Sequence, residues 1–178
     1  MLSDNSRIIL ELYNPGKTYN NQKKFDCENA IINKFVASSL KKQVRDELSR
    51  AFVLLDTNDN GRFVGFYTLS SFSIKAPMLT ALSKGSLPSD IPCSRLIMLG
   101  IDINYKRRGL GKQLMKSVIQ KTIAAADQIG IYGLYLDADE DAYTFYDNLG
   151  FITLQEKKGT KPTPMFLSIE TMRELNQA

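Results

Sequence analysis

Apolar residues recur along the chain in two patterns, short runs typical of strands and longer repeats with the spacing of helices. The strand-like runs lie at residues 8–13, 51–56, 63–70, 94–103, 134–137, 151–155 and 165–169. Helical spacing occurs at 28–50, as one helix or a broken pair, and at 109–129 and 141–149. A helical or irregular insert is expected between 77 and 92. This order predicts a mixed α/β sheet with at least one right-handed strand–helix–strand crossover.

Two segments indicate where the sheet is covered. Residues 94–103 form a nearly all-apolar strand, which is typical of a central position buried on both faces. In the helix that follows, Leu114 and Val118, like Met115 and Ile119, recur at the four-residue spacing of one buried face. Asn60-Gly61 predicts a hairpin turn, because both residues tolerate positive φ. No repeat or long linker interrupts the chain, so we expect a single domain over residues 1–178.

A basic turn with two glycines connects the apolar strand to the long helix. Amides at a helix N-terminus have no acceptor within the helix and lie at the positive end of its dipole. Gly109 and Gly111 would let a ligand phosphate approach this backbone, and four basic side chains flank it. These are Lys106, Arg107, Arg108 and Lys112. The alternative is a tight strand-to-helix turn with basic residues on its surface.

Two better-known phosphate-binding patterns are excluded. The dinucleotide-binding pattern needs a third glycine three residues after the second, but Leu114 stands there. A Walker loop needs Ser or Thr after Gly-Lys, but Gln113 follows Lys112.

Composition is that of an ordinary globular protein, with 178 residues of which 43% are hydrophobic and 24% charged. No run approaches the roughly 18 apolar residues of a membrane span. The first residues lack the pattern of a signal peptide, and Cys27 and Cys93 are too few for a disulfide scaffold. We therefore expect a cytoplasmic protein without membrane association.

The chain has no histidine, which excludes a histidine base, a triad histidine and the usual zinc sites. No metal site is predicted. The net charge of +4 and the pI near 9.0 favour anionic partners such as phosphates or nucleic acid. A solvated basic surface would give the same charge.

The basic turn resembles the pyrophosphate loop of the GNAT acetyltransferases, which reads Gln/Arg-x-x-Gly-x-Gly/Ala after a central strand. Residues 106–111 (KRRGLG) match it, except that Lys106 stands where Gln or Arg is usual. A second stretch, 139–151 (DEDAYTFYDNLGF), is similar to the Ala-x-x-Phe-Tyr-x-x-x-Gly-Phe region of the same family. The resemblance implies the GNAT fold, an α/β fold whose mixed, mostly antiparallel sheet is flanked by helices and contains a central splayed strand pair.

The same resemblance implies acetyl-CoA as co-substrate and assigns residues to it. Those expected to bind the cofactor are Ile101, Ile103, Lys106, Arg107, Arg108, Gly109, Leu110, Gly111, Lys112 and Asp139. Tyr146 is the expected catalytic residue, a general acid that protonates the departing thiolate. Without the family pattern, Tyr146 would be read as a half-buried aromatic with its hydroxyl in water. A backbone amide near Gly100 or Ile101 is expected to hold the oxyanion.

Other segments resemble a narrower group, the GNAT-type toxins of bacterial toxin–antitoxin modules. These are Phe25-Asp26-Cys27, Ile32-Asn33-Lys34-Phe35, the run from Val64 to Ser70 and the run from Pro164 to Ile169. This resemblance implies acetylation of the α-amino group of an aminoacyl-tRNA, which blocks translation. It also implies a cognate antitoxin of the ribbon-helix-helix type, and it leaves a homodimer open.

The nature of the acceptor amine is argued from its pKa. An α-amino group, with a pKa of about 7.7–8.0, needs less help from a base than a lysine side chain does, which favours the aminoacyl ester. The alternatives are a small-molecule or protein amine as acceptor, or a non-catalytic acetyl-CoA-binding interaction module. Asp137, Asp139, Glu140 and Asp141 fit a helix start better than a site for a cation. Basic groups that could meet tRNA are Lys41, Lys42, Arg45 and Arg50 on the first helices, and Lys157, Lys158 and Lys161.

Overall fold

A computed structural model describes residues 7–79, 85–156 and 159–178. Its contacts divide the chain into two compact units, one containing residues up to 70 and 98–118, the other containing 71–97 and 119–178. Strands β3 (Arg62–Lys75) and β4 (Asp90–Ile101) and helix α3 (Leu110–Ala126) run from one unit into the other. The prediction of a single domain is not tested by this division and stays a prediction.

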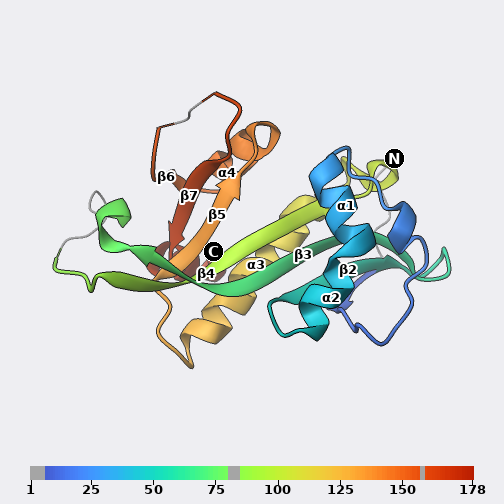
Figure 1. Cartoon of the computed structure of the whole chain (residues 1–178), viewed down its shortest axis with the longest axis horizontal. Helices are drawn as coiled ribbons and strands as arrows, with labels where there is room; N and C mark the ends of the chain where they lie inside the picture. The colour runs from blue at the N-terminus through green and yellow to red at the C-terminus, as the bar shows by residue number, and fades with distance from the viewer. Residues whose placement is uncertain (1–6, 80–84, 157–158) are drawn as a thin grey trace. The chain divides into compact units, whose positions relative to one another are not determined.

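The first unit is built on antiparallel strands with two helices against them. Strand β1 (Ile8–Leu12) pairs with β2 (Arg50–Asp56), and β2 pairs with β3. Helices α1 (Ala30–Ser38) and α2 (Leu40–Arg45) lie in front of these strands in Figure 1. The core between them consists of buried apolar side chains that include Phe25, Phe35, Leu40, Phe63 and Phe66. The helical region is thus the predicted broken pair, and Asn60 and Gly61 take the positive φ values expected of the hairpin turn, 52° and 66°.

The second unit contains the rest of the sheet. Strand β5 (Gly133–Ala138) pairs with β7 (Thr163–Ser168), and β7 pairs with the short β6 (Ile152–Thr153). A side chain at Gly133 would lie 2.2 Å from the Phe166 ring, so only glycine lets β5 and β7 approach here. Helices α4 (Tyr143–Asn148) and α5 (Ile169–Gln177) follow β5 and β7. Four short 3-10 helices complete the described elements: η1 (Gln22–Lys24), η2 (Ala76–Leu79), η3 (Ile103–Tyr105) and η4 (Glu140–Ala142).

Strands β4 and β5 are parallel neighbours that separate after a short pairing. The strands follow one another in the order β1-β2-β3-β4-β5-β7-β6, so β4 is central, as predicted. Pairing between β4 and β5 extends only from Cys93↔Gly133 to Arg95↔Tyr135, although β4 continues to Ile101 and β5 to Ala138. The predicted splayed strand pair is therefore confirmed.

Several predicted boundaries are wrong. Strand β3 continues past its predicted end at Ser70 to Lys75, and β4 begins at Asp90 and so takes the last residues of the expected insert. The insert starts with η2, which fits the predicted helical segment, while residues 80–84 lie outside the described residues. The two strands are longer than predicted because Ile74 and Ile91 are buried in the second core cluster. Arg50 opens β2 and does not lie on a helix. Helix α5 was missed because it is mostly polar and buries only Met172.

Candidate active site

The turn between β4 and α3 is held by a dense set of hydrogen bonds. The buried Asp102 side chain accepts from the backbone N–H of Asn104, at 3.0 Å, and so caps η3. The Asp102 N–H donates to the Val64 carbonyl at 2.8 Å, and the Ile103 N–H donates to the Asp26 carbonyl at 2.7 Å. Most of the polar groups at the start of the turn are therefore satisfied within the protein.

The second half of the turn has a different backbone. Arg107 has φ 62° and Gly109 has φ 74°, so two of the three residues 107–109 adopt the left-handed backbone conformation. Residues other than glycine rarely adopt this conformation. The Gly109 carbonyl accepts from the Gln113 N–H at 3.1 Å, the bond that opens α3. The amides of the first helical turn that follow have no acceptor within the helix. Apart from its two chain neighbours, no atom of the described residues lies within 4 Å of where a Gly109 side chain would begin, so the space beside this residue is open. This is the geometry of an anion site at a helix N-terminus.

The four basic side chains of the turn are not equivalent. The Lys106 ammonium donates to the Cys27 carbonyl at 3.0 Å and pairs with Glu28 at 2.7 Å. Arg108 lies over the Tyr105 ring, 4.7 Å from its centroid. Arg107 and Lys112 are exposed and have no ion pair within the described part of the chain. Of the predicted phosphate ligands, Arg107 and Lys112 therefore have free side chains, whereas any contact from Lys106 would have to come from its backbone.

Tyr105 anchors the turn from beneath. Its hydroxyl donates to the Asp56 carboxylate at 2.8 Å, and both residues are buried. Burial first, and then the bond to Asp56, raise the pKa of the Tyr105 hydroxyl to about 12. Sequence reasoning missed this pair. The signal was an aromatic residue inside an otherwise polar turn, which indicates a buried anchor.

Asn33 explains one of the motifs that carried the toxin resemblance. Its side-chain oxygen accepts from the Cys27 N–H at 2.9 Å, and its amide donates to the Asp26 carboxylate at 2.9 Å. The 26–28 segment is thereby tied to α1, and the same segment receives Lys106 and Ile103 from the turn. The role of Asn33 in this chain is to position backbone.

The predicted cofactor residues on β4 and just after it are placed as follows. Ile101 packs toward Gly65, because its δ1 carbon lies 2.8 Å from where a Gly65 side chain would begin. Ile103 is 44% exposed. A side chain at Gly100 would meet Phe25, Cys27 and Ile32 at 3.3 Å, so the backbone is closely approached there. The oxyanion amide near Gly100 stays a prediction.

Tyr146 lies in the second unit, on α4. It is 8% exposed, and its ring meets the rings of Phe145 and Phe151 edge-on at 5.2 and 5.6 Å. Its hydroxyl has no hydrogen-bond partner among the described residues, and it is not one of the fully enclosed polar atoms. Burial, followed by the negative charge of Asp139, raises the pKa of the Tyr146 hydroxyl. The hydroxyl therefore holds its proton at neutral pH, and none of the described residues accepts that proton in a hydrogen bond.

The acidic residues at the end of β5 and just after it have two different roles. The Asp139 carbonyl accepts from the Ala142 and Tyr143 N–H groups, and Glu140 and Asp141 lie in the first turn of η4. This confirms the helix-start interpretation for these three residues. Asp137 instead pairs with Arg95 at 3.0 Å and accepts from the Tyr135 hydroxyl at 2.8 Å.

No group of histidine, cysteine and carboxylate side chains that could hold a metal occurs in the described residues. None of the helices in the described part of the chain is long and apolar enough to cross a membrane. The predicted basic residues differ in their partners: Lys42 and Arg45 pair with Asp46, and Arg50 pairs with Glu47, while Lys161 belongs to the second unit. Lys157 and Lys158 lie outside the described residues.

Residues 17–169 match the sequence profile of the acetyltransferase (GNAT) domain. The chain belongs to the GNAT acetyltransferase family. A tRNA-acetylating toxin of Mycobacterium tuberculosis is 32% identical over 128 residues, which cover 71% of this chain and 73% of the toxin. A Sinorhizobium fredii protein named "Probable toxin TacT" is 28% identical over 96% of both chains.

Several solved structures are similar to this protein over almost the whole chain. The crystal structure of a bacterial toxin has a TM-score of 0.91 and 34% identity, over 96% of this chain and 95% of that one. AtaT complexed with acetyl-methionyl-tRNAfMet has a TM-score of 0.83 and 26% identity, over 94% and 98%. A tyrosine-to-phenylalanine mutant of the AtaT toxin, bound to the C-terminus of the antitoxin AtaR and acetyl-CoA, has a TM-score of 0.79 and 25% identity, over 97% and 99%. The predicted GNAT fold is confirmed.

The turn geometry predicts the effect of a negative charge at its glycines. Gly109→Glu places a carboxylate where the pyrophosphate is expected, and Gly109→Ala imposes the same left-handed strain of about 1–2 kcal/mol without the charge. We expect calorimetry to show acetyl-CoA affinity about 10- to 100-fold weaker for Gly109→Glu than for Gly109→Ala, as for loss of a charge-assisted contact. Gly111→Glu should act in the same direction. Equal affinity of folded Gly109→Glu and Gly109→Ala would show that the phosphates bind elsewhere.

The bond between Tyr105 and Asp56 gives a second prediction. Tyr105→Phe leaves one oxygen of the buried Asp56 carboxylate without a donor, while the other still accepts from the Asn58 N–H, so the free energy of unfolding should fall by about 1.5–3 kcal/mol. Because the turn loses its anchor, acetyl-CoA binding should weaken as well.

The matched control is Tyr67→Phe, which removes another buried tyrosine hydroxyl bond, to Ser117 at 2.7 Å, away from the turn. It should lower stability and leave acetyl-CoA affinity unchanged. If both variants bind acetyl-CoA like the wild type, Tyr105 has no part in positioning the turn.

Proposed function

We propose that this protein is a toxin that transfers the acetyl group of acetyl-CoA to the α-amino group of an aminoacyl-tRNA and thereby blocks translation. The observation that carries the proposal is the turn before α3, where two left-handed residues and an open glycine present helix-terminal amides to an anion. The choice of an aminoacyl-tRNA as acceptor is supported by two proteins that are similar over most of the chain. One is a tRNA-acetylating toxin, and the other is AtaT complexed with acetyl-methionyl-tRNAfMet.

The first unit holds the cofactor in this proposal. The pyrophosphate of acetyl-CoA lies at the backbone of residues 107–112, with Arg107 and Lys112 adding charge-assisted contacts. Ile101, Ile103 and the backbone of Lys106 and Arg108 complete the first-unit contacts, with Gly109, Leu110 and Gly111. Asp139 is the remaining residue that the family resemblance assigns to the cofactor.

The reaction is an acyl transfer with one enzymatic proton donor. The neutral amine attacks the thioester carbonyl carbon, and a backbone amide near Gly100 or Ile101 holds the oxyanion. When the C–S bond breaks, the thiolate takes the proton of the Tyr146 hydroxyl, and the amine loses its extra proton to solvent. A thiol of pKa about 8.5 leaves more easily when a proton is supplied as the bond breaks. Tyr146 then regains a proton from water.

No histidine is available to deprotonate the amine. An aminoacyl ester suits such a site, because an α-amino group of pKa about 7.7–8.0 is already partly neutral at the pH of a cytoplasm. A lysine side chain, with a pKa of about 10.4, would need a positioned base.

Partners and location complete the proposal. We infer a cognate antitoxin, because the related AtaT is bound to its antitoxin AtaR. A ribbon-helix-helix antitoxin, a homodimeric toxin and a cytoplasmic location are parts of the proposal that the toxin resemblance supports.

The acceptor is tested by product identification. The wild-type protein, labelled acetyl-CoA and total charged tRNA should give label that is lost when the aminoacyl ester is hydrolysed and recovered as an N-acetylamino acid. Free amino acids should be poor acceptors beside their tRNA esters, since they lack the RNA contacts. Efficient acetylation of a free polyamine or drug with charged tRNA untouched would favour the small-molecule alternative. Binding of acetyl-CoA without transfer to any amine would favour the non-catalytic module.

A further inference from the structure

A basic hollow of about 720 Å³ lies in the first unit, apart from the turn before α3. Its wall comes from the segment between β1 and α1 and from the facing sides of α1 and α2. The lining residues used below are Lys17, Lys23, Lys24 and Lys41, with Tyr13 and Tyr19 beneath them. None of its lining residues is acidic.

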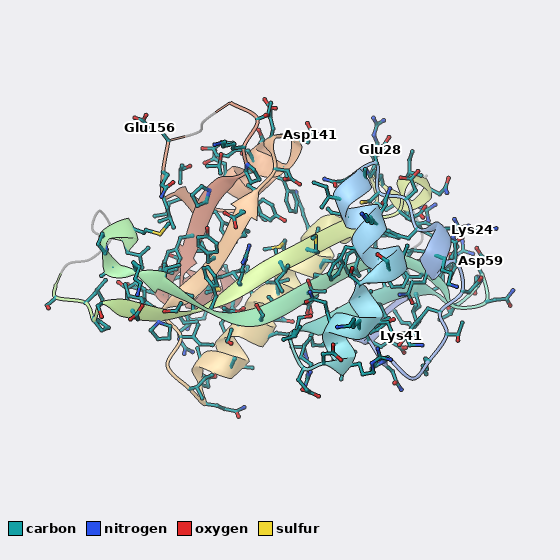
Figure 2. All side chains as sticks on the ribbon, in the orientation of Figure 1. Lys24, Glu28, Lys41, Asp59, Asp141 and Glu156 are labelled. Atoms are coloured by element: carbon teal, nitrogen blue, oxygen red, sulfur yellow. The ribbon has the colours of Figure 1, made fainter. Side chains whose placement is uncertain are left out.

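Three of the four lysines carry uncompensated charge. Lys17 pairs with Glu11 at 3.5 Å, whereas Lys23, Lys24 and Lys41 have no ion pair among the residues that the structure describes. All are exposed, and Figure 2 labels Lys24 on η1 and Lys41 on α2. The positive charge therefore gathers at the hollow and remains available to a ligand.

The neighbouring basic residues on α2 and β2 behave differently. Lys42 and Arg45 both approach Asp46, at 2.9 and 3.9 Å, and Arg50 pairs with Glu47. Asp46 and Glu47 thus neutralise these three residues, whereas Lys23, Lys24 and Lys41 in the hollow keep their charge. A hollow lined by ammonium donors and free of carboxylates fits a ligand made of hydrogen-bond acceptors with negative charge.

The two tyrosines beneath the lysines are packed and hydrogen-bonded, whereas the Asn21 Nδ2, also in the lining, has no hydrogen-bond partner among the described residues. Tyr13 and Tyr19 are buried and stacked at 4.9 Å between ring centroids. The Tyr19 hydroxyl accepts from the Asn14 N–H at 2.8 Å, and Gln22 bonds both Tyr13 and the Val36 carbonyl. The two rings are therefore not free to stack on bases. The lysine ammoniums are the charged groups of the lining that remain for recognition.

We propose that this hollow binds the phosphodiester backbone of the RNA acceptor, through Lys23, Lys24 and Lys41. The inference rests on the proposed function, since an enzyme that acetylates a charged tRNA must hold the RNA outside the reacting centre. Contacts of this type position the nucleic acid and do not read its sequence. Each phosphate that a lysine neutralises releases a counterion, so binding must weaken as salt rises.

The test compares two triple variants with the same loss of charge. The hollow variant carries Lys23→Gln, Lys24→Gln and Lys41→Gln. The control carries Lys34→Gln, Lys75→Gln and Arg173→Gln, three exposed positions outside the hollow. Affinity for a fluorescently labelled, deacylated tRNA is measured by anisotropy over a salt series, and acetyl-CoA affinity is measured by calorimetry.

For the hollow variant, we expect the slope of log affinity against log salt to fall by about 2–3, because each phosphate contact contributes about 0.7–0.9. The control should keep a slope near that of the wild type, and both variants should bind acetyl-CoA like the wild type. Equal slopes for the two variants would overturn the proposal. So would a hollow variant that keeps tRNA binding but loses binding of a polyglutamate peptide, because the hollow would then serve an acidic protein.

The direct binding readout separates this proposal from the proposed function. If the wild type binds tRNA through the hollow but acetylates no charged tRNA, the hollow assignment stands and the acceptor assignment fails. If charged tRNA is acetylated and the hollow variant shows an unchanged salt slope and an unchanged KM for it, the acceptor assignment stands and the hollow assignment fails.

Discussion

The hydrogen bond from the Tyr105 hydroxyl to the buried Asp56 carboxylate joins the end of β2 to the turn after β4. A carboxylate at 7% exposure is costly unless it is bonded, and displacement of the turn would leave one of the two Asp56 oxygens without its donor. The bond fixes the turn on its core side, and the contacts of Asp102 and Lys106 fix it along its length. With those groups satisfied, the strained backbone at Arg107 and the left-handed Gly109 are held in place, which is the condition for storing strain at a binding site. The proposed anion site at the start of α3 thus depends on a buried pair beneath the turn.

Much of the architecture could be predicted from periodicity and turn chemistry. The apolar run of β4, the buried stripe of α3 and the Asn60-Gly61 turn are local patterns, and each produced the expected element. The turn of residues 106–112 could be found because its glycines and basic residues stand between a buried strand and a long helix. Helix α5 could not, since it buries one side chain and its sequence resembles a polar tail. The extension of β3 and β4 was also beyond local reasoning, because Ile74 and Ile91 are buried by partners distant in sequence.

Side-chain roles were harder to predict than backbone positions. Lys106 was expected at the pyrophosphate by family position, but its ammonium binds the Cys27 carbonyl and Glu28, two groups that only the folded chain brings near. Lys41, Lys42, Arg45 and Arg50 were considered together as candidates for RNA contact, but Asp46 and Glu47 pair with all except Lys41. The spacing of apolar residues predicts which charged side chains lie on the surface. Which of those charges remain without an ion pair depends on residues that are neighbours only in the folded chain.

The central claim is that Tyr146 supplies the proton for an acetyl transfer to charged tRNA, and its direct test is the turnover of Tyr146→Phe. This change removes one hydroxyl that has no partner among the described residues and keeps the ring that packs against Phe145 and Phe151. The variant should fold and bind acetyl-CoA like the wild type, because the lost interaction forms mainly in the transition state. Measured where chemistry limits the rate, kcat should fall by about 10²–10⁴-fold, the usual contribution of a general acid. A folded variant with wild-type kcat would contradict the account, because the thiolate would then take its proton from water or from another group.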